Sequence, residues 1–375
     1  MIRVFQPWIF KEDYLSVINA LLKKQISGTS SYVGKFENKF KDKFNKEYAV
    51  AVSNGSVALD LALESLNLND DDEVILPSFT IVSCLSAVIR AGGKPIFCDV
   101  DINNWNTTLE NVKKVFTKKT KAVLVVHTYG LPSEIQEIRD FCDDNNLVLI
   151  EDTAEAHGLK YNNKYCGTFG DISTFSFYAN KHITSGEGGM VVTDNIKIYK
   201  RLLQMRNLDF DNSRRFVHEN MFWNYRMGGL QAALGYSQIS NLDRVIKHKQ
   251  RQGDTYLELL NNHTNIFQLP KTKFKDTYNH FWVFGIVLKS PKIRDVLIEK
   301  LYDNGIETRP FFWPLHLQPF YLNNSSKNKV DLTNSEYIGN NGLYLPLGSH
   351  LNMKKQKYIT NVLIEETKKL QDSIT

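Results

Sequence analysis

The chain has 375 residues, of which 42% are hydrophobic and 23% charged, and its formal net charge is +5. This length is sufficient for about two domains, and the composition is that of an ordinary globular protein. The basic residues form no block or aromatic-interleaved patch, which argues against nucleic acid as a partner. No apolar run approaches the roughly 20 residues that cross a bilayer, and the N-terminus does not resemble a signal peptide. We therefore expect a cytoplasmic protein without membrane contact.

The cysteines show neither CxxC spacing nor partnered histidines; they are Cys84, Cys98, Cys142 and Cys166. This pattern is typical of reduced cysteines in a cytoplasmic core, and it favours neither a disulfide framework nor a zinc site. We expect no bound metal.

The N-terminal region predicts two helices. Residues 12–24 have helical periodicity, and a polar, glycine-containing segment follows at 27–34. The second helix is expected from about Gly34 to Lys46, and it carries phenylalanines at spacings of four, namely Phe36, Phe40 and Phe44. A stripe of this kind indicates core packing rather than a cofactor-binding surface.

A strand at 49–52 runs into a turn of small residues, Ser53-Asn-Gly-Ser56, and an apolar helix begins at once. A strand, a turn and a helix N-terminus together can bind an anion, because free backbone N–H groups and the helix dipole point at it. The alternative is an ordinary N-cap, with Ser53 or Asn54 closing the first turn. This segment alone leaves both interpretations open.

Apolar strands then alternate with helices; the strands are 73–77, 94–99, 122–127 and 147–152, and the helices are 80–91 and 133–145. This alternation predicts a parallel sheet covered on both faces, with ligands beyond the carboxyl ends of its strands. Asp152 ends one strand, and the Gly55 turn follows another. A cap for the following turn is the alternative role for Asp152.

Two further strands are expected at 173–177 and 189–193, with Lys181 in the turn between them. Glycines at 186, 188 and 189 would let another molecule approach this turn closely. A lysine so placed is a candidate for Schiff-base chemistry, although most lysines are solvated surface groups. The Gly55 turn, Asp152 and Lys181 together are what pyridoxal phosphate requires: an anion site, a carboxylate for the pyridine nitrogen and an amine for the aldehyde.

The remainder of the chain predicts a helix ending at about 206 and a long helix reaching about Asn262. Beyond it we expect a strand at 278–288, a helix from Pro291 to Asn304, a loop at 308–316 and a final helix at 354–370. The pattern of expected strands and helices predicts a large α/β domain over 1–262, with an N-terminal helical segment, and a smaller α+β domain over 263–375.

Seven motifs carry a resemblance to a known family: Val52-Ser-Asn-Gly-Ser56, Leu76-Pro-Ser-Phe-Thr80, Ile150-Glu-Asp-Thr-Ala-Glu-Ala-His-Gly158, Gly167-Thr-Phe-Gly-Asp171, Phe175-Ser-Phe-Tyr-Ala-Asn-Lys181, Ser185-Gly-Glu-Gly-Gly-Met-Val191 and Asn224-Tyr-Arg-Met227. The chain resembles the DegT/DnrJ/EryC1/StrS family of pyridoxal-phosphate sugar aminotransferases over nearly its whole length. The resemblance implies the α/β fold of type I: a mostly parallel seven-stranded sheet flanked by helices, with a smaller C-terminal α+β domain.

The resemblance also implies roles for individual residues. Lys181 corresponds to the lysine that binds the cofactor covalently, and Asp152 to the partner of the pyridine nitrogen. Glu155, commonly Gln in the family, would lie near the ring hydroxyl. The phosphate would be held by Gly55, Ser56 and Ser176.

Other implied contacts lie outside this centre. Asn224 would reach the phosphate of a neighbouring subunit, which implies a homodimer with shared active sites. Arg309 and His316 lie in the stretch that meets the sugar nucleotide. Ile81 stands where the family usually has an aromatic residue stacked on the ring, so the stack would lack the aromatic contribution of about 0.5–1.5 kcal/mol. Gly228 and Gly229 also depart from the family pattern, in a region that could influence substrate choice.

The motifs most resemble those of members that aminate C4 of GDP-4-keto-6-deoxymannose with L-glutamate, for surface polysaccharide such as O-antigen. The first alternative is another nucleotide-linked keto sugar, carried by UDP or dTDP and aminated at C3 or C4, or another keto substrate. Dehydration is a second, but related 3-dehydratases have histidine in place of the lysine, so Lys181 argues for transamination. A non-catalytic, cofactor-binding regulator is the third.

Overall fold

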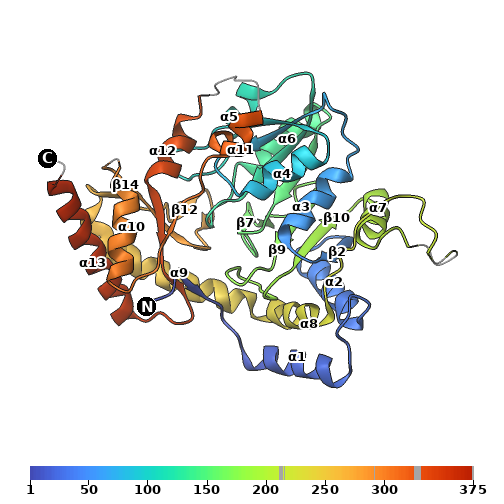
Figure 1. Ribbon diagram of the computed structural model, residues 1–375, viewed down its shortest axis with the longest axis horizontal. Helices are drawn as coiled ribbons and strands as arrows, with labels where there is room; N and C mark the ends of the chain where they lie inside the picture. The colour runs from blue at the N-terminus through green and yellow to red at the C-terminus, as the bar shows by residue number, and fades with distance from the viewer. Residues whose placement is uncertain (211–213, 215, 291, 325–330, 374–375) are drawn as a thin grey trace.

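The protein is described by a computed structural model that covers residues 1–210, 214, 216–290, 292–324 and 331–373. Its centre is a seven-stranded sheet (Figure 1), whose strands follow the order β2 (Tyr48–Val52), β10 (Gly189–Thr193), β9 (Ile172–Ser176), β6 (Val148–Asp152), β5 (Thr120–Val126), β3 (Glu73–Pro77) and β4 (Lys94–Cys98). Only β10 runs antiparallel to its neighbours among these strands. The predicted mostly parallel sheet is confirmed.

Alternate residues of these strands pack on opposite faces of the sheet, because successive side chains of a strand point to opposite sides. Val74 and Leu76 pack on one face, which is covered by α3 (Gly55–Glu64), α4 (Val82–Arg90) and α7 (Ile196–Arg206). Ile75 packs on the other face, under α5 (Leu109–Val115) and α6 (Ile135–Asp144). At the β2 end, that second face is covered by α2 (Ser31–Phe44) and α8 (Gly229–Gln238). Burial of both faces explains the continuous apolar runs of the strands.

The phenylalanine stripe on α2 packs in the core, as predicted. Phe36, Phe40 and Phe44 are fully buried, and the Phe40 ring lies 4.8 Å from that of Phe175 on β9. The helix begins at Ser31, three residues before the expected start, because the Ser30 side chain accepts the N–H of Tyr32 and caps it. This packing anchors β9, the strand that leads to Lys181.

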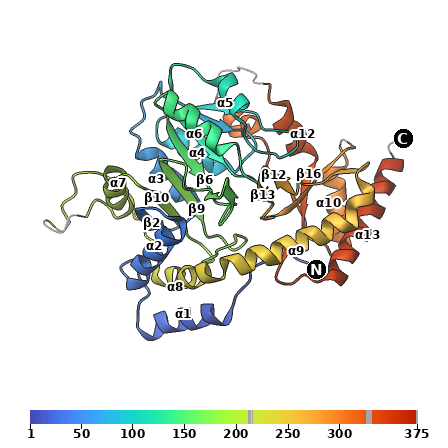
Figure 2. The same cartoon turned by 180° about the vertical axis from the view of Figure 1, so that it is seen from behind.

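A second, antiparallel sheet has the order β11 (Phe267–Gln268), β14 (Phe284–Leu288), β16 (Gly342–Leu345) and β15 (Arg309–Pro310). Its core also includes residues from the helices α9 (Leu242–Leu260), α10 (Arg294–Asp303) and α13 (Met353–Asp372). Figure 2 shows α9 running from the large sheet toward this smaller one. The division of the chain after residue 262 stays a prediction.

Two expected elements are interrupted. The long helix is divided into α8 and α9 by a 3-10 turn, η1 (Ile239–Asn241), where Ser240 and Asn241 are weak helix formers. The expected strand at 278–288 is broken before β14, because Phe281 has a left-handed φ of 46° and its N–H bonds to the Asn279 side chain. The expected helix start at Pro291 lies outside the described residues.

The smaller elements complete the chain. They are β1 (Phe5–Gln6), α1 (Lys11–Leu22), β7 (Lys160–Tyr161), β8 (Lys164–Tyr165), η2 (Asn261–His263), β12 (Lys273–Phe274), β13 (Thr277–Tyr278), η3 (Leu315–Leu317), α11 (Pro319–Asn324), α12 (Thr333–Asn341) and β17 (Leu347–Gly348). Strand β1 pairs in parallel with β17, so the N-terminal strand lies beside a C-terminal one. Both views place the N-terminus and the last helix, α13, near the smaller sheet (Figures 1 and 2).

Candidate active site

The lysine turn, residues 177–188 between β9 and β10, lies against the small-residue turn that follows β2. A Cβ on Gly189 would lie 2.3 Å from the Asn54 carbonyl oxygen, so only a glycine permits this approach. A Cβ on Gly55 would lie 2.7 Å from that of Ser176. The close backbone contact therefore brings Ser176 to the N-terminus of α3.

The N-cap interpretation of the Ser53–Ser56 turn is confirmed, and the binding of an anion there stays a prediction. The Asn54 side chain accepts the Val57 N–H at 2.9 Å and is the N-cap of α3. The first N–H groups of a helix have no partner within the helix, and the helix dipole favours an anion there. Ser56 is exposed at this end, and its hydroxyl lies 2.7 Å from that of Ser83 on α4. Gly55, Ser56 and Ser176 thus converge as predicted, and Ser83 joins them.

Asp152 is buried at the carboxyl end of β6. One carboxyl oxygen accepts the Ala154 N–H at 3.0 Å, so the strand-end capping role is also real. The other accepts the thiol of Cys84 at 3.4 Å, which is a weak donor. Burial raises the pKa of Asp152, while the charge of Lys181 opposes this increase. Because this second oxygen of the buried carboxyl group has only a thiol as its donor, it is suited to accept a hydrogen bond from a cationic N–H group.

Lys181 lies next to Glu155 inside the protein. Its Nζ atom is 3.9 Å from Oε1 of Glu155 and 3.9 Å from the centroid of the Trp282 ring. The other Glu155 oxygen accepts the backbone N–H of Tyr129 at 2.9 Å. Burial raises the pKa of Glu155 to about 7 and lowers the pKa of Lys181. A lysine with lowered proton affinity can accept and return a proton near neutral pH.

These residues fit pyridoxal phosphate. The helix N-terminus supplies an anion site, Asp152 supplies a buried carboxylate, and Lys181 supplies an amine of lowered pKa. Ile81 is 41% exposed at the start of α4, only three residues before Cys84. Its exposed aliphatic side chain is suited to pack against the face of a flat ring. Among the described residues, no group of three or more acidic, histidine or cysteine side chains could hold a metal.

The segment around Asn224 runs beside the same turn. The Tyr225 carbonyl accepts the Ser53 N–H at 2.9 Å, and Val52 forms an isolated bridge with Arg226. Asn224 itself is exposed and pairs through its backbone with Asn207. The role of Asn224 toward a phosphate stays a prediction. Gly228 and Gly229 begin α8 as N-cap and first residue, so this departure from the family pattern is at a helix start.

The two predicted substrate contacts differ in exposure. Arg309 on β15 is exposed and forms an ion pair with Glu307. His316 is buried, and its ring nitrogens lie 2.6 Å from the Ser78 hydroxyl and 3.2 Å from a Glu336 carboxyl oxygen. Ser78 follows β3 directly, so His316 connects the edge of the large sheet to α12. Their contact with substrate stays a prediction.

Sequence reasoning missed several residues around Lys181, Glu155 and Asp152: Cys84, Tyr129, His157, Lys249 and Trp282. Of these, only His157 lay in a quoted motif; its ring accepts the Ile183 N–H at 3.2 Å and so fixes the lysine turn. For Cys84 the sequence pattern predicts only a reduced core residue. For Tyr129, Lys249 and Trp282 the sequence carried no signal, because they approach from other parts of the chain.

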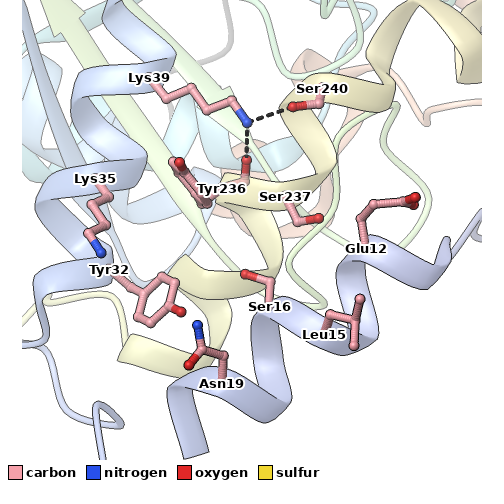
Figure 3. A pocket seen from close by; sticks show the side chains of 10 residues that line it. All are labelled: Glu12, Leu15, Ser16, Asn19, Tyr32, Lys35, Lys39, Tyr236, Ser237 and Ser240. Atoms are coloured by element: carbon pink, nitrogen blue, oxygen red, sulfur yellow. Dashed lines mark hydrogen bonds between the residues drawn. The ribbon is translucent and has the colours of Figure 1, made fainter. Parts of the chain in front are cut away.

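A hollow of about 470 Å³ lies beside α1, apart from the Lys181 site (Figure 3). It is lined by residues of α1, α2, α8 and η1, including Tyr32, Lys35 and Tyr236, and by none of the candidate site residues. Lys39 at its edge donates to the Tyr236 carbonyl and the Ser240 hydroxyl, which connects α2 to α8 and η1. In the part of the chain that is described, no helix is long and apolar enough to cross a membrane.

Comparison with known proteins places the chain among aminotransferases and related enzymes. The pattern of the DegT/DnrJ/EryC1/StrS aminotransferase family matches residues 9–364. GDP-perosamine synthase of Escherichia coli O157:H7 is 38% identical over 97% of this chain and 98% of its own length. The enzyme of that name from Vibrio cholerae is 37% identical over 97% and 98%. The solved structure of E. coli GDP-4-keto-6-deoxy-D-mannose-3-dehydratase with bound hydrated PLP has a TM-score of 0.87 at 27% identity, covering 97% of this chain and 99% of that one.

Proposed function

Because the chain belongs to the DegT/DnrJ/EryC1/StrS aminotransferase family, we propose that it transfers an amino group from L-glutamate to C4 of GDP-4-keto-6-deoxymannose. It is a pyridoxal-5'-phosphate-dependent aminotransferase that acts on a GDP-linked sugar. The main support for this reaction type is Lys181, a buried amine that lies beside Glu155 and interacts electrostatically with Asp152.

When bound, the cofactor supplies an aldehyde for the amino group and a ring that withdraws electrons from the carbon that loses a proton. Asp152 would keep the ring nitrogen protonated, and the N-terminus of α3 with Ser176 would hold the phosphate. Lys181 would anchor the cofactor and, as a free amine, would carry the proton. Glu155 accepts a hydrogen bond from Tyr129, which holds its carboxyl beside the lysine.

The choice of sugar rests on the GDP-perosamine synthases, which match almost the full length of this chain. Transamination of another nucleotide-linked keto sugar is the alternative. Dehydration is disfavoured by Lys181, since a base that also anchors the cofactor is what amino transfer needs. The product belongs in surface polysaccharide such as O-antigen, and we assign the enzyme to the cytoplasm.

We also propose a homodimer in which Asn224 of one subunit reaches the phosphate of the other. Exposed apolar side chains lie on the two segments that contact the anion turn, with Ile81 and Val82 just before Ser83 and with Met221 and Trp223 just before Tyr225. Exposed apolar patches of this kind favour association with a partner surface. A second subunit would cover them and complete the site.

The test is a screen of GDP-, UDP- and dTDP-linked keto sugars with L-glutamate, with each product identified by mass spectrometry and NMR. We expect an amine at C4 of the GDP sugar and equimolar 2-oxoglutarate. A product lacking a hydroxyl group and containing no nitrogen would indicate dehydration instead. A visible cofactor band that does not change on addition of glutamate would indicate a binding protein without catalysis.

A further inference from the structure

A second buried lysine, Lys249, lies behind the lysine turn. It is on α9 and is only 3% exposed. Its Nζ atom donates to two backbone carbonyls, that of Trp282 at 2.8 Å and that of Asn180 at 3.3 Å. Among the described residues, no carboxylate lies within ion-pair distance of it. A buried amine whose partners are carbonyls alone is costly to charge.

The two carbonyls belong to the residues that frame Lys181. Asn180 precedes Lys181 in the lysine turn, and the Trp282 ring lies under the Lys181 amine. Helix α9 itself joins the two cores, since Ile246 packs with the large sheet and Tyr256 with the small one. Lys249 lies between these anchors and contacts both the turn and the segment before β14.

We propose that Lys249 is a positioning residue for Lys181, which holds the lysine turn against the Trp282 segment and keeps a second positive charge behind the reactive amine. The proposal rests on the role given to Lys181 under the proposed function. It assigns Lys249 no contact with the substrate or the cofactor.

The charges around the pair support this role. Glu155 and Asp152 face Lys181, and their carboxylates favour its protonated form. Burial, followed by the charge of Lys181, lowers the pKa of Lys249 to about 7. Lys249 is thus partly charged near pH 7, and in its charged form it repels the protonated form of Lys181.

The nearby histidines do not supply this charge. Burial lowers the pKa of His157 to about 3 and that of His182 well below its ordinary value. Both rings are therefore neutral near pH 7, and Lys249 is the neighbouring group that can add positive charge behind Lys181.

The chain offers a matched control in Lys46, which is also buried. Its amine donates to the Gly170 carbonyl at 3.4 Å and to Asp194 at 2.8 Å, away from the site residues. Replacement of either lysine removes a buried amine and its hydrogen bonds. Only replacement of Lys249 is expected to change the pH at which Lys181 becomes reactive.

The experiment compares the wild type with Lys249→Met, Lys249→Arg and Lys46→Met. The full-length proteins are freed of cofactor and treated with acetic anhydride over a range of pH, and acetylation of the Lys181 peptide is followed by mass spectrometry. We expect Lys249→Met to raise the midpoint pH of Lys181 labelling by about one unit. This is the pKa shift that one neighbouring charge causes at an effective dielectric constant of about 20. Lys249→Arg, permanently charged, keeps the midpoint at or below that of the wild type, and Lys46→Met leaves it unchanged.

An equal midpoint in Lys249→Met and the wild type would overturn the proposal, even if the variant were less stable. Should Lys249→Met fail to fold, Lys249→Arg carries the test, and a midpoint above that of the wild type overturns the proposal. Borohydride treatment of the cofactor-loaded wild type separates the two ideas. Cofactor trapped on a residue other than Lys181 refutes both, whereas trapping on Lys181 with unmoved midpoints refutes only the role of Lys249.

Discussion

The Nζ atom of Lys181 lies 3.9 Å from a carboxyl oxygen of Glu155, and both side chains are almost completely buried. Burial alone would leave the lysine neutral and the carboxyl protonated, while their mutual attraction favours both charges. The pair therefore has a proton that can move at modest cost. This is the property that a proton-transferring lysine requires. Replacement of either residue should therefore change the protonation of the other.

Replacement of Lys181 by alanine is expected to lower turnover by at least about 10³-fold, because both the anchor and the proton carrier are lost. The fold should persist, since the ammonium group contributes little to the core. Initial rates with glutamate and the keto sugar, with circular dichroism as the folding control, provide the measurement. Turnover like that of the wild type would remove Lys181 from its role.

Asp152→Asn is expected to retain cofactor but to lower the rate by about 10²–10⁴-fold, since a neutral amide cannot keep the ring nitrogen protonated. The cofactor-free variant should be no less stable than the wild type at pH 7. Burial raises the pKa of Asp152 in the folded state, so this carboxyl favours folding at low pH and disfavours it once ionised. Thermal melts and rates measured together check both statements. An unchanged rate would mean that another carboxylate serves the nitrogen.

Glu155→Gln is expected to lower the pKa of Lys181 further, because the carboxylate that favours its ammonium form is removed. Charges about 4 Å apart interact by about 4 kcal/mol at an effective dielectric constant of about 20, so a shift of at least about one pH unit is expected. The midpoint pH of Lys181 acetylation in the cofactor-free protein gives the value. Glu336→Gln, which alters a carboxyl next to His316, is the control. A midpoint that rises in Glu155→Gln contradicts the pairing.

Mixing two inactive variants, Lys181→Ala and Asn224→Asp, is expected to restore activity after subunit exchange. In a heterodimer with shared sites, one site receives both lesions and the other receives neither. The aspartate repels a phosphate by about 1 kcal/mol at a few ångströms in water, and by more at a partly buried site. Activity is measured after incubation under conditions that allow exchange.

Each variant mixed with itself serves as the control for this experiment, together with size measurements that establish dimers. Exchanged mixtures that stay inactive, although both variants fold and dimerise, would show that Asn224 acts within its own subunit. An active monomer at high dilution would contradict the shared site as well.

The sequence predicted local structure correctly where the residues of one short segment determine its conformation. The turn after β2, the end of β6 and the lysine turn were all predicted from runs of fewer than about twenty residues, and the structure brings them together. The same kind of reasoning extended a strand through Phe281 and a single helix through Ser240. It failed there because an Asn279 hydrogen bond and weak helix formers interrupt an otherwise apolar pattern.

The sequence by itself determined the alternating strands and helices, the sheet edge where the site lies, and Asp152 and Lys181 as its candidate centre. Periodicity and turn chemistry act over a few residues, so they can be read without a fold. Only the tertiary structure decided what surrounds the lysine: Trp282 beneath its amine, Tyr129 on Glu155, and Lys249 behind the turn. These residues come from segments far apart in the chain, and their burial, which changes the pKa of each ionisable group, exists only once the two cores have packed.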